Sequence, residues 1–444
     1  MRTIRNKIPS DLLGKTFDCE CGKKHSVAIR EIIYAESAVS AAPSVLKRNF
    51  NGKTACLIAD QRTFAAAGEA LASSLSSGGF KIAKLILPEG KACKEPVCDD
   101  ITLEFILRQL PECDFLIAAG SGVVSDLTKW TSAKTGRPYA AFATAASMNG
   151  YSSANIAPAI KGVKRLIDGV CPRAIMASPS IIREAPYKLT TAGLGDVLAK
   201  PVSITDWRMS KLLFGEYFCP LCAKMISEIE PAYLNNPQGI LGREAVAMEA
   251  LFKALIYSGL SMTIAGTSSP SSGGEHMISH ALDSTALAQE LEHDYHGRQV
   301  GLGTIFACAL YERILALESP QVKLQSEPTN ENFWQSLTPV LEEEHARKRS
   351  KAARAVEQLK KKDSWDELRS LAKKSIRTPA EIRNCLKTAG AAWRIADIDC
   401  DRRRFLDAAL NCHQMRERYT VIDLARAVGI MPRAADEIIE EYLV

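Results

Sequence analysis

The sequence contains no stretch of about 18 consecutive apolar residues, and its start, MRTIRNKIPSDLLGK, includes no apolar run. The first absence predicts that the chain has no membrane span, and the second that it has no signal peptide. Internal repeats and low-complexity tracts are also absent from the sequence. We therefore expect an ordinary globular protein located in the cytoplasm.

A strong excess of one charge is also absent, because 56 basic residues balance 51 acidic ones and leave a net charge of +5. Composition therefore gives no reason to expect a nucleic-acid partner. The one strongly basic segment, residues 345–377, carries Leu, Ala and Val at helical spacing. This pattern is typical of amphipathic helices with a solvated charged face, and we favour it over a phosphate-backbone site.

The cysteines do not form the pattern of a disulfide framework, since there are 13 of them, an odd number, in apolar contexts such as KTACLIAD. We expect buried, reduced thiols. Two clusters each resemble half of a zinc site: CECGKKH holds Cys19, Cys21 and His25, and CPLC holds Cys219 and Cys222. A full site needs four ligands, and neither cluster has an obvious second half nearby in the sequence, so their role is left open.

The 444 residues, 46% of them hydrophobic and 24% charged, are enough for two or three domains with large cores. Strand and helix patterns alternate between residues 50 and 145. Strands are predicted at 54–60, 81–87, 114–120 and 138–144, and helices at 62–79, 99–111 and 123–136. This alternation predicts a parallel sheet covered by helices on both faces, an architecture that often binds nucleotides.

Long helical patterns replace the strand patterns from about residue 186, as in EAVAMEALFKALIYSGLSMTIAG. We therefore predict an α/β, Rossmann-like nucleotide-binding domain over residues 1–185. An all-α domain is predicted over residues 186–444.

A candidate phosphate-binding turn follows the strand predicted at 114–120, where Gly120, Ser121 and Gly122 lead into a helix. Glycines let a phosphate approach the backbone, and the helix N-terminus offers free N–H groups. A plain tight turn explains the same residues, because the third glycine of the usual motif is missing. Asp60, at the end of another strand, could accept hydrogen bonds from an adenosine ribose and would favour NAD over NADP, unless it only caps the next helix.

Four of the seven histidines fall within residues 276–296. His276 and His280 are four residues apart and share a helical face, as in zinc proteases, but the protease glutamate would lie between them, whereas Glu275 lies outside. Asp196 and His296 follow in the motifs AGLGDVLAK and YHGRQVGLGT. Two imidazoles and one carboxylate would hold a divalent ion and leave a position for a substrate oxygen, although each residue alone is more often structural.

Five motifs in order carry a family resemblance: GSGVVSDLTKW, TAASMNGYSS, GLGDVLAKPVSITDWRMS, GGEHMISHALD and HGRQVGLGT. They resemble the sn-glycerol-1-phosphate dehydrogenase branch of the glycerol dehydrogenase and dehydroquinate synthase superfamily, most closely its bacterial members. The resemblance covers most of the chain, including CECGKKHSV near the start and HQMRERYTVIDLA near the end.

The resemblance implies a metal-dependent, NAD(H)-linked reduction of dihydroxyacetone phosphate to sn-glycerol 1-phosphate. It places a divalent metal, zinc, nickel or iron, on Asp196, His276 and His296, with His280 facing the substrate. Asp196, His280 and Asn149 occupy its catalytic positions. A homo-oligomer that binds a phosphorylated triose or polyol, with NADP as a second possible cofactor, is also implied. The residues implied to contact the cofactor are Asp60, Gly120, Ser121, Gly122, Val123, Val124, Thr144, Ser147 and Ser153.

Three positions depart from the family pattern. Asn149 stands where the family usually has an aspartate near the substrate, Ser269 where arginine is common, and Arg298 where glutamate or lysine is common. These changes leave three alternatives open: a dehydrogenase of the same fold for another polyol or keto compound, a lyase similar to dehydroquinate synthase, and a binding protein without turnover.

Overall fold

The computed structural model describes residues 11–90, 95–161, 163–289 and 291–444. The chain divides into two compact units. Unit 1 comprises the chain up to Gly193 together with Gly242–Thr267, and unit 2 comprises Leu194–Leu241 and Ser268–Val444. The division therefore differs from a single boundary after residue 185, because the chain returns to unit 1 for one long helix.

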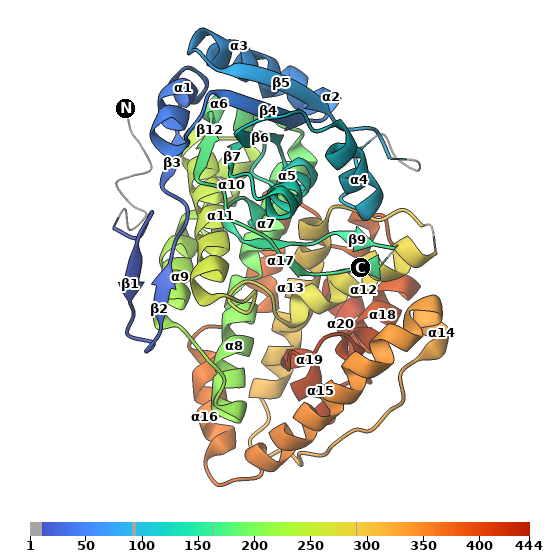
Figure 1. The fold of residues 1–444 in the computed structure, drawn as a ribbon. Coiled ribbons are helices and arrows are strands. Elements are labelled where there is room, and N and C mark those ends of the chain that lie inside the picture. The colour runs from blue at the N-terminus through green and yellow to red at the C-terminus, as the bar shows by residue number, and fades with distance from the viewer. Residues whose placement is uncertain (1–10, 91–94, 162, 290) are drawn as a thin grey trace. The chain divides into compact units, whose positions relative to one another are not determined.

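A parallel six-stranded sheet forms the centre of unit 1 (Figure 1). Its strand order is β3-β12-β7-β6-β4-β5, and every neighbouring pair is parallel. The strands are β3 (Glu31–Tyr34), β4 (Thr54–Ala59), β5 (Lys81–Ile86), β6 (Phe115–Gly120), β7 (Tyr139–Ala143) and β12 (Ala174–Ala177). The sheet predicted from the alternation of strands and helices is confirmed, with β3 and β12 in addition.

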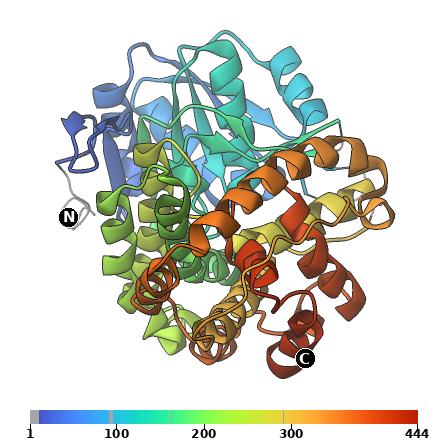
Figure 2. The same ribbon diagram turned by 90° about the horizontal axis from the view of Figure 1, so that it is seen from below.

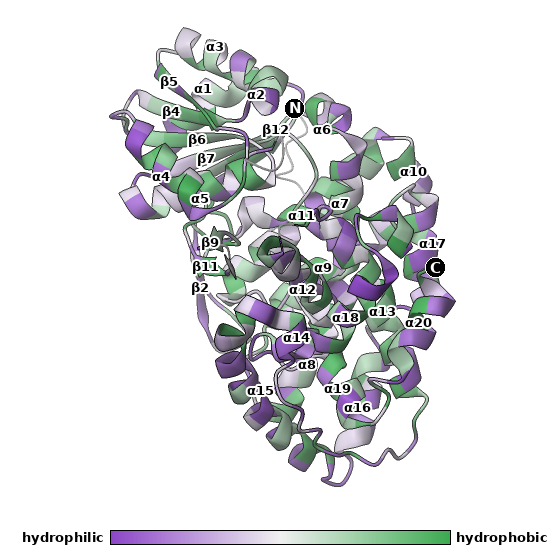
Figure 3. Ribbon diagram, turned by 90° about the vertical axis from the view of Figure 1, so that its right-hand side faces the viewer, coloured by the Kyte–Doolittle hydropathy of each residue, from purple (hydrophilic) through white to green (hydrophobic). Residues whose placement is uncertain are grey.

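Side chains alternate between the two faces of this sheet, as the pleat of a strand requires. Leu57 packs in one buried apolar cluster with α1 (Ala38–Asn49) and α3 (Glu69–Ser77). Its neighbour Ile58 packs in a second cluster with α4 (Asp100–Gln109) and α5 (Gly122–Thr135). Helices thus cover both faces, which explains why the central strands β4 and β6 read as nearly continuous apolar runs and are drawn largely in green in Figure 3.

The segment predicted as one helix over 62–79 is interrupted. It consists of α2 (Gln61–Thr63), the π-helical η2 (Phe64–Gly68) and α3. Unit 1 also contains α6 (Pro179–Glu184) and η3 (Gly150–Ser152). Short antiparallel pairs complete it: β1 (Thr16–Asp18) with β2 (Lys24–Ser26), β8 (Asn155–Ile156) with β11 (Ile167–Asp168), and β9 (Ala159–Ile160) with β10 (Val163–Lys164).

Helix α11 (Ala245–Ala265) belongs to unit 1, where it packs against η3, α6 and β2. By length and composition alone it could cross a membrane, since an 18-residue window of it has a mean hydropathy of 1.3. The expectation that the chain has no membrane span stays a prediction. Within the structure, 72% of its apolar window is buried. That burial is typical of the core helix of a globular domain.

The described residues of unit 2 are helical and contain no strand (Figure 2). Its longest helices are α13 (His296–Leu315) and α15 (Thr338–Leu359). The other helices of at least seven residues are α8 (Lys200–Phe214), α9 (Pro220–Leu234), α12 (Gly274–Ala288), α16 (Ser364–Lys373), α17 (Pro379–Thr388), α18 (Arg402–Asn411), α19 (Val421–Ala427) and α20 (Ala434–Tyr442). Helix α7 (Tyr187–Leu198) leads into the unit, and the short pieces are α10 (Pro237–Leu241), α14 (Glu331–Trp334), η4 (Gln335–Leu337), η5 (Ile395–Asp397) and η6 (Cys412–Gln414).

The basic segment 345–377 forms amphipathic helices, as predicted. Helix α15 buries Leu341, Val356 and Leu359, and α16 buries Leu368 and Ala372. Charged residues cover their other faces, which are purple in Figure 3.

Candidate cofactor and metal sites

The predicted phosphate turn joins β6 to α5 in unit 1. Gly120 ends the strand, Ser121 is the N-cap, and Gly122 opens a 14-residue helix whose first N–H groups have no partner within the helix. A Cβ on Gly120 would lie 2.5 Å from the Cβ of Val124, so this position has room only for glycine. A Cβ on Gly122 would meet nothing closer than Met148 Cγ at 3.7 Å. Gly122 is therefore not required by packing, which leaves its small size for a ligand that approaches the backbone.

Asp60 acts as a helix cap. Its Oδ1 accepts a hydrogen bond of 2.7 Å from the backbone N–H of Thr63, and the Thr63 hydroxyl in turn pairs with the backbone N–H of Asp60. This capping box explains the aspartate without a cofactor. The argument for NAD over NADP from Asp60 therefore loses its support, and a ribose contact from this carboxylate remains a prediction.

Lys129 of α5 holds the segment after β7 in place. Its ammonium group is completely buried and contacts Asp126 Oδ1 at 3.1 Å, the Gly150 carbonyl oxygen at 2.9 Å and the Asn155 carbonyl oxygen at 2.8 Å. This segment contains the predicted cofactor residues Thr144, Ser147 and Ser153, all of which are buried. Sequence reasoning did not single out Lys129, because a lysine in a helix is usually exposed.

Asn149 lies in the same segment and donates a hydrogen bond of 3.1 Å from Nδ2 to the Ser258 hydroxyl on α11. The amide thus keeps its side chain anchored within unit 1. An aspartate at this position could accept a hydrogen bond from the same hydroxyl, so the departure from the family pattern changes charge more than shape.

The predicted metal ligands Asp196 and His276 lie together in unit 2. Asp196 Oδ1 is 3.6 Å from His276 Nε2, and both side chains are buried. Lys200, one turn after Asp196, contacts the same oxygen at 2.8 Å. Although burial by itself would raise the pKa of Asp196, the Lys200 ammonium and the hydrogen bond with His276 hold that pKa below its usual value. The carboxylate is therefore ionised, as a metal ligand must be.

Neighbouring groups fix the orientation of both candidate ligand histidines. His276 Nδ1 pairs with Glu275 Oε1 at 2.7 Å, which leaves Nε2 facing Asp196. His296 Nδ1 pairs with the Ser279 hydroxyl at 2.8 Å, and the two histidine rings lie 5.3 Å apart, centroid to centroid. A protein group on Nδ1 with Nε2 left for an ion is the usual arrangement of ligand histidines. The donor set of one carboxylate and two imidazoles therefore fits a divalent metal such as zinc, nickel or iron.

A second combination of ligand atoms overlaps this one. Atoms of His280, Asp283 and His296 all lie within 4.8 Å of one another, and Asp283 Oδ2 is 3.6 Å from His296 Nδ1. The His280 and His296 rings are stacked at 5.2 Å. Sequence reasoning missed Asp283, three residues after His280 on α12, although the i, i+3 spacing could have indicated it. Both sets share His296 and differ in the other two ligands, which are Asp196 and His276 in one set and His280 and Asp283 in the other.

A buried acidic network lies behind His276. Asp206 accepts hydrogen bonds from the Gly274 N–H at 2.8 Å, the Val421 N–H at 3.0 Å and the Tyr311 hydroxyl. Burial and the nearby charge of Glu275 raise the pKa of Asp206 to about 8. These contacts tie the N-terminus of α12, and with it Glu275 and His276, to α8, α13 and α19. None of them was predicted, because the residues come from distant parts of the sequence.

Arg298, which departs from the family pattern, and His293, one of the four histidines within residues 276–296, both contact aspartates. Arg298 is buried and its Nε contacts Asp294 Oδ2 at 2.8 Å, so its charge is used in an ion pair. His293 Nδ1 lies 3.5 Å from Asp283 Oδ1. Neither observation places a substrate contact, and the structure gives no account of Ser269 as a recognition residue.

The chain is similar to known proteins over most of its length. Residues 33–186 match a family described as iron-containing alcohol dehydrogenase. A glycerol-1-phosphate dehydrogenase [NAD(P)+] of Bacillus velezensis is 34% identical over 307 residues, which cover 68% of this chain and 76% of that protein. The protein of the same name from Thermococcus kodakarensis is 33% identical and covers 68% and 83%. That from Bacillus licheniformis is 28% identical and covers 93% of each chain.

Solved structures share the fold at low identity. A probable glycerol dehydrogenase of Sinorhizobium meliloti superposes with a TM-score of 0.59 at 15% identity, covering 93% of this chain and 98% of that one. A maleylacetate reductase of Agrobacterium tumefaciens gives a TM-score of 0.61 at 13% identity, with 94% and 97% covered. These likenesses establish the architecture: a parallel sheet with helices, followed by a mostly helical part.

Proposed function

Because the chain belongs to the glycerol-1-phosphate dehydrogenase family, we propose that it is a metal-dependent, NAD(P)-linked dehydrogenase acting on sn-glycerol 1-phosphate and dihydroxyacetone phosphate. The observation that carries the metal part of this proposal is the orientation of His276. Its Nδ1 is held by Glu275, and its Nε2 faces the buried, ionised Asp196. The cofactor and substrate parts of the proposal are supported by the names of the relatives and by the glycine-containing turn before α5.

The metal ion and the nicotinamide cofactor would supply different parts of the reaction. A divalent ion on Asp196, His276 and His296 supplies Lewis-acid polarisation of the substrate oxygen, and NAD(P)H supplies the hydride. Glu275 and Ser279 hold the two histidine rings through Nδ1, which leaves Nε2 of each ring for the ion. His280, at the same end of α12, is proposed to contact substrate rather than metal.

The residues of unit 1 would serve the cofactor. The free N–H groups at the start of α5 are suited to a pyrophosphate, and Gly122 allows close approach. Lys129 holds the segment that carries Thr144, Ser147 and Ser153. We propose that NADH and NADPH are both candidates, since Asp60 is used as a cap. A cytoplasmic location, a homo-oligomeric state and a role in phospholipid synthesis belong to the same proposal.

The direct test uses the purified protein, stripped of metal and reloaded separately with zinc, nickel and iron(II). Each preparation is mixed with dihydroxyacetone phosphate and either NADH or NADPH, and loss of the reduced cofactor is followed by absorbance. We expect oxidation of at least one cofactor with at least one metal, and none with the apoprotein. No oxidation under any condition would refute the proposed substrate or the activity itself.

Two other outcomes distinguish the alternatives. Oxidation of reduced cofactor by a different keto compound, but not by dihydroxyacetone phosphate, would identify a dehydrogenase for another substrate. Release of inorganic phosphate from a sugar phosphate without net change in NADH would identify a lyase. Tight binding of NADH without any turnover would favour a binding protein.

A further inference from the structure

The hairpin near the start of unit 1 brings sulfur and nitrogen donors together. Strands β1 and β2 pair in antiparallel register, with Phe17 opposite His25. The loop between them is fixed by hydrogen bonds from Cys19 N–H to the Lys23 carbonyl at 3.1 Å and from Gly22 N–H to the Cys19 carbonyl at 2.9 Å. Gly22 has a φ of +81°, which glycine adopts without strain. This turn places Cys21 across from His25.

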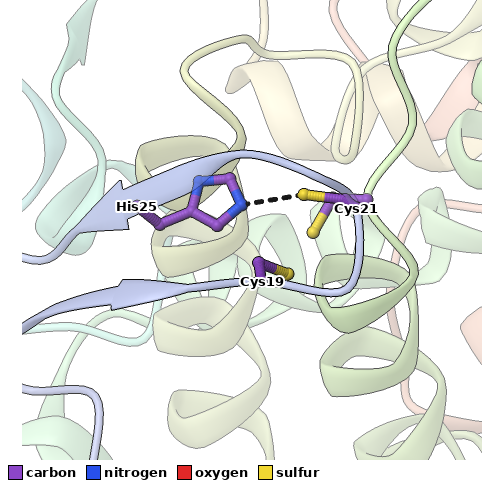
Figure 4. A group of neighbouring side chains, drawn as sticks. Cys19, Cys21 and His25 are labelled. Atoms are coloured by element: carbon purple, nitrogen blue, oxygen red, sulfur yellow. Dashed lines mark hydrogen bonds between the residues drawn. The ribbon is translucent and has the colours of Figure 1, made fainter.

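The donor atoms have the separations of a metal site. Cys21 Sγ lies 3.1 Å from His25 Nε2, and one ligand atom each of Cys19, Cys21 and His25 lies within 4.8 Å of the others. Zinc bonds of about 2.3 Å to sulfur and about 2.0 Å to nitrogen at tetrahedral angles separate the two donors by roughly 3.6 Å. Figure 4 shows the His25 ring directed at Cys21, with Cys19 on the adjoining strand end. A small rotation of the side chains would thus suffice for coordination.

We propose that Cys19, Cys21 and His25 form a structural zinc site, separate from the metal site of unit 2. Thiolates with an imidazole are soft ligands that select zinc, whereas the carboxylate and imidazoles of Asp196, His276 and His296 contain no sulfur. The hairpin site therefore has a ligand chemistry of its own. A fourth ligand completes the coordination, either a water molecule or a further protein donor.

The hairpin has a physical need for such an ion. Each strand has three residues, and only His25 among them is buried, so the pair has almost no apolar core of its own. Isolated two-stranded hairpins are marginally stable in water. A bound ion would tie both strands and the loop together, and metal binding of this kind contributes directly to folding. Because β2 packs against α11, the ion would also fix that contact within unit 1.

Cobalt(II) provides a test that is specific for a metal site with thiolate ligands. The full-length protein is stripped of metal under reducing, anaerobic conditions and loaded with cobalt(II). We expect a thiolate-to-cobalt charge-transfer band in the near ultraviolet. The band should disappear in Cys21→Ser and in the double variant Cys19→Ser with Cys21→Ser. It should remain in His276→Ala, which alters the thiol-free site, and in Cys113→Ser, which removes a thiol elsewhere in unit 1.

Zinc content gives an independent measurement. The protein purified with zinc should lose one equivalent per chain in Cys21→Ser, while circular dichroism shows whether the variant has folded. His25→Gln tests the same ligand set without removing a thiol and should weaken zinc retention at least tenfold. Separate Cys219→Ser and Cys222→Ser variants ask whether the Cys-x-x-Cys pair of the sequence supplies the fourth ligand. Absence of the charge-transfer band in the wild type, or its persistence in the double variant, would overturn the proposal whether or not the enzyme is active.

Discussion

His276 and His280 stand one turn apart on α12, yet their surroundings differ. Glu275 holds His276 Nδ1 at 2.7 Å, and His276 Nε2 lies 3.6 Å from the ionised Asp196. His280 instead stacks on His296 at 5.2 Å. Because Glu275 fixes the His276 ring opposite a carboxylate, we propose His276 as the ligand, with the set of His280, Asp283 and His296 as the alternative.

The metal ligands can be assigned by single substitutions. We expect His276→Ala and His296→Ala to weaken metal binding at least about 100-fold, since each removes a donor, while His280→Ala keeps the ion and reduces turnover. Metal content of the dialysed variants and steady-state rates are the measurements. Asp283→Asn is the matched control for the overlapping set. Loss of metal in His280→Ala and Asp283→Asn, with retention in His276→Ala, would show that the ion sits on the other three residues.

Asn149 offers a second test at the scale of one residue. Asn149→Asp preserves size, and the new carboxylate can accept a hydrogen bond from Ser258, whose hydroxyl now accepts at 3.1 Å from the amide. If the proposed substrate is correct, we expect the rate with glycerol 1-phosphate to rise about 100-fold, the lower end of the range that a placed proton acceptor contributes. Steady-state kinetics with Asn149→Ala as control measure this. An unchanged or lower rate in the aspartate variant would favour another substrate.

At the scale of one element, the turn into α5 separates a glycine needed for folding from one available to a ligand. Gly120→Ala places a Cβ 2.5 Å from Val124, whereas Gly122→Ala makes only an ordinary contact with Met148 at 3.7 Å. We expect Gly120→Ala to destabilise unit 1 by about 1–3 kcal/mol, the usual range for overpacking. Gly122→Ala should keep the melting temperature and raise the Kd for NADH about tenfold, or about 1.4 kcal/mol.

Thermal unfolding and NADH fluorescence titration of the two variants check this pair. Wild-type affinity of Gly122→Ala for NADH would show that the cofactor does not approach the backbone at Gly122. A wild-type melting temperature for Gly120→Ala would show that a side chain at residue 120 does not disturb the packing against Val124.

The elements that could be predicted from the sequence are those determined by local residue patterns. Those that depend on the folded geometry could not be predicted. The strands β4, β6 and β7 followed from local apolar runs, because buried parallel strands are apolar on both faces. The edge strand β5 followed from its apolar residues although its Lys81 and Lys84 are exposed. The π-helical η2 did not follow, since its residues FAAAG have the composition of an ordinary helix. Asp60 looked like a ribose ligand from its position, and only the geometry showed that it caps α2.

For the site, motif spacing indicated Asp196, His276 and His296, but not the groups that hold them. Glu275 is adjacent in sequence to His276, Lys200 lies four residues after Asp196, and Ser279 lies 17 residues before His296. Only the side-chain directions reveal these contacts with the predicted ligands. Asp206, Tyr311 and Val421 are far apart in the chain and converge only through packing of α8, α13 and α19. Long-range convergence of this kind leaves no local pattern in a single sequence.

At the scale of the whole molecule, the course of the chain between two units was the feature hardest to predict. Helical patterns from residue 186 suggested one helical domain, but α11 belongs to unit 1, where it packs against η3, α6 and β2. Its apolar residues are distributed around the whole helix, and 72% of its apolar window is buried. Such a pattern indicates that a helix is buried, but it does not indicate whether the helix belongs to the core of unit 1 or of unit 2.

Two buried histidines should lower the stability of unit 2 in mild acid, because burial and nearby cations disfavour their protonation in the folded state. His345 and His413 pack edge to face at 5.6 Å, with Lys348 and Arg426 nearby. Burial, reinforced by these cations, lowers the pKa of His345 to about 4 and that of His413 well below its usual value. The unfolded chain therefore binds protons from about pH 6.5 downward, where the folded chain does not.

These two histidines therefore make their full contribution to the free energy of unfolding above pH 6.5, and that contribution falls as the pH is lowered towards 4, by about 1.4 kcal/mol for each unit of pKa depression. Asp206, whose pKa is raised to about 8, contributes a slope of the opposite sign over this range, in the wild type and in a histidine variant alike. Urea unfolding between pH 7.5 and 5, above the range where ordinary carboxylates titrate, measures this slope. Replacing the titrating ring in His413→Gln should reduce the slope even if the variant is less stable at every pH, because the slope reports protons taken up and not packing lost. Equal slopes for the wild type and the variant would show that His413 takes up its proton in the folded state as readily as in the unfolded one.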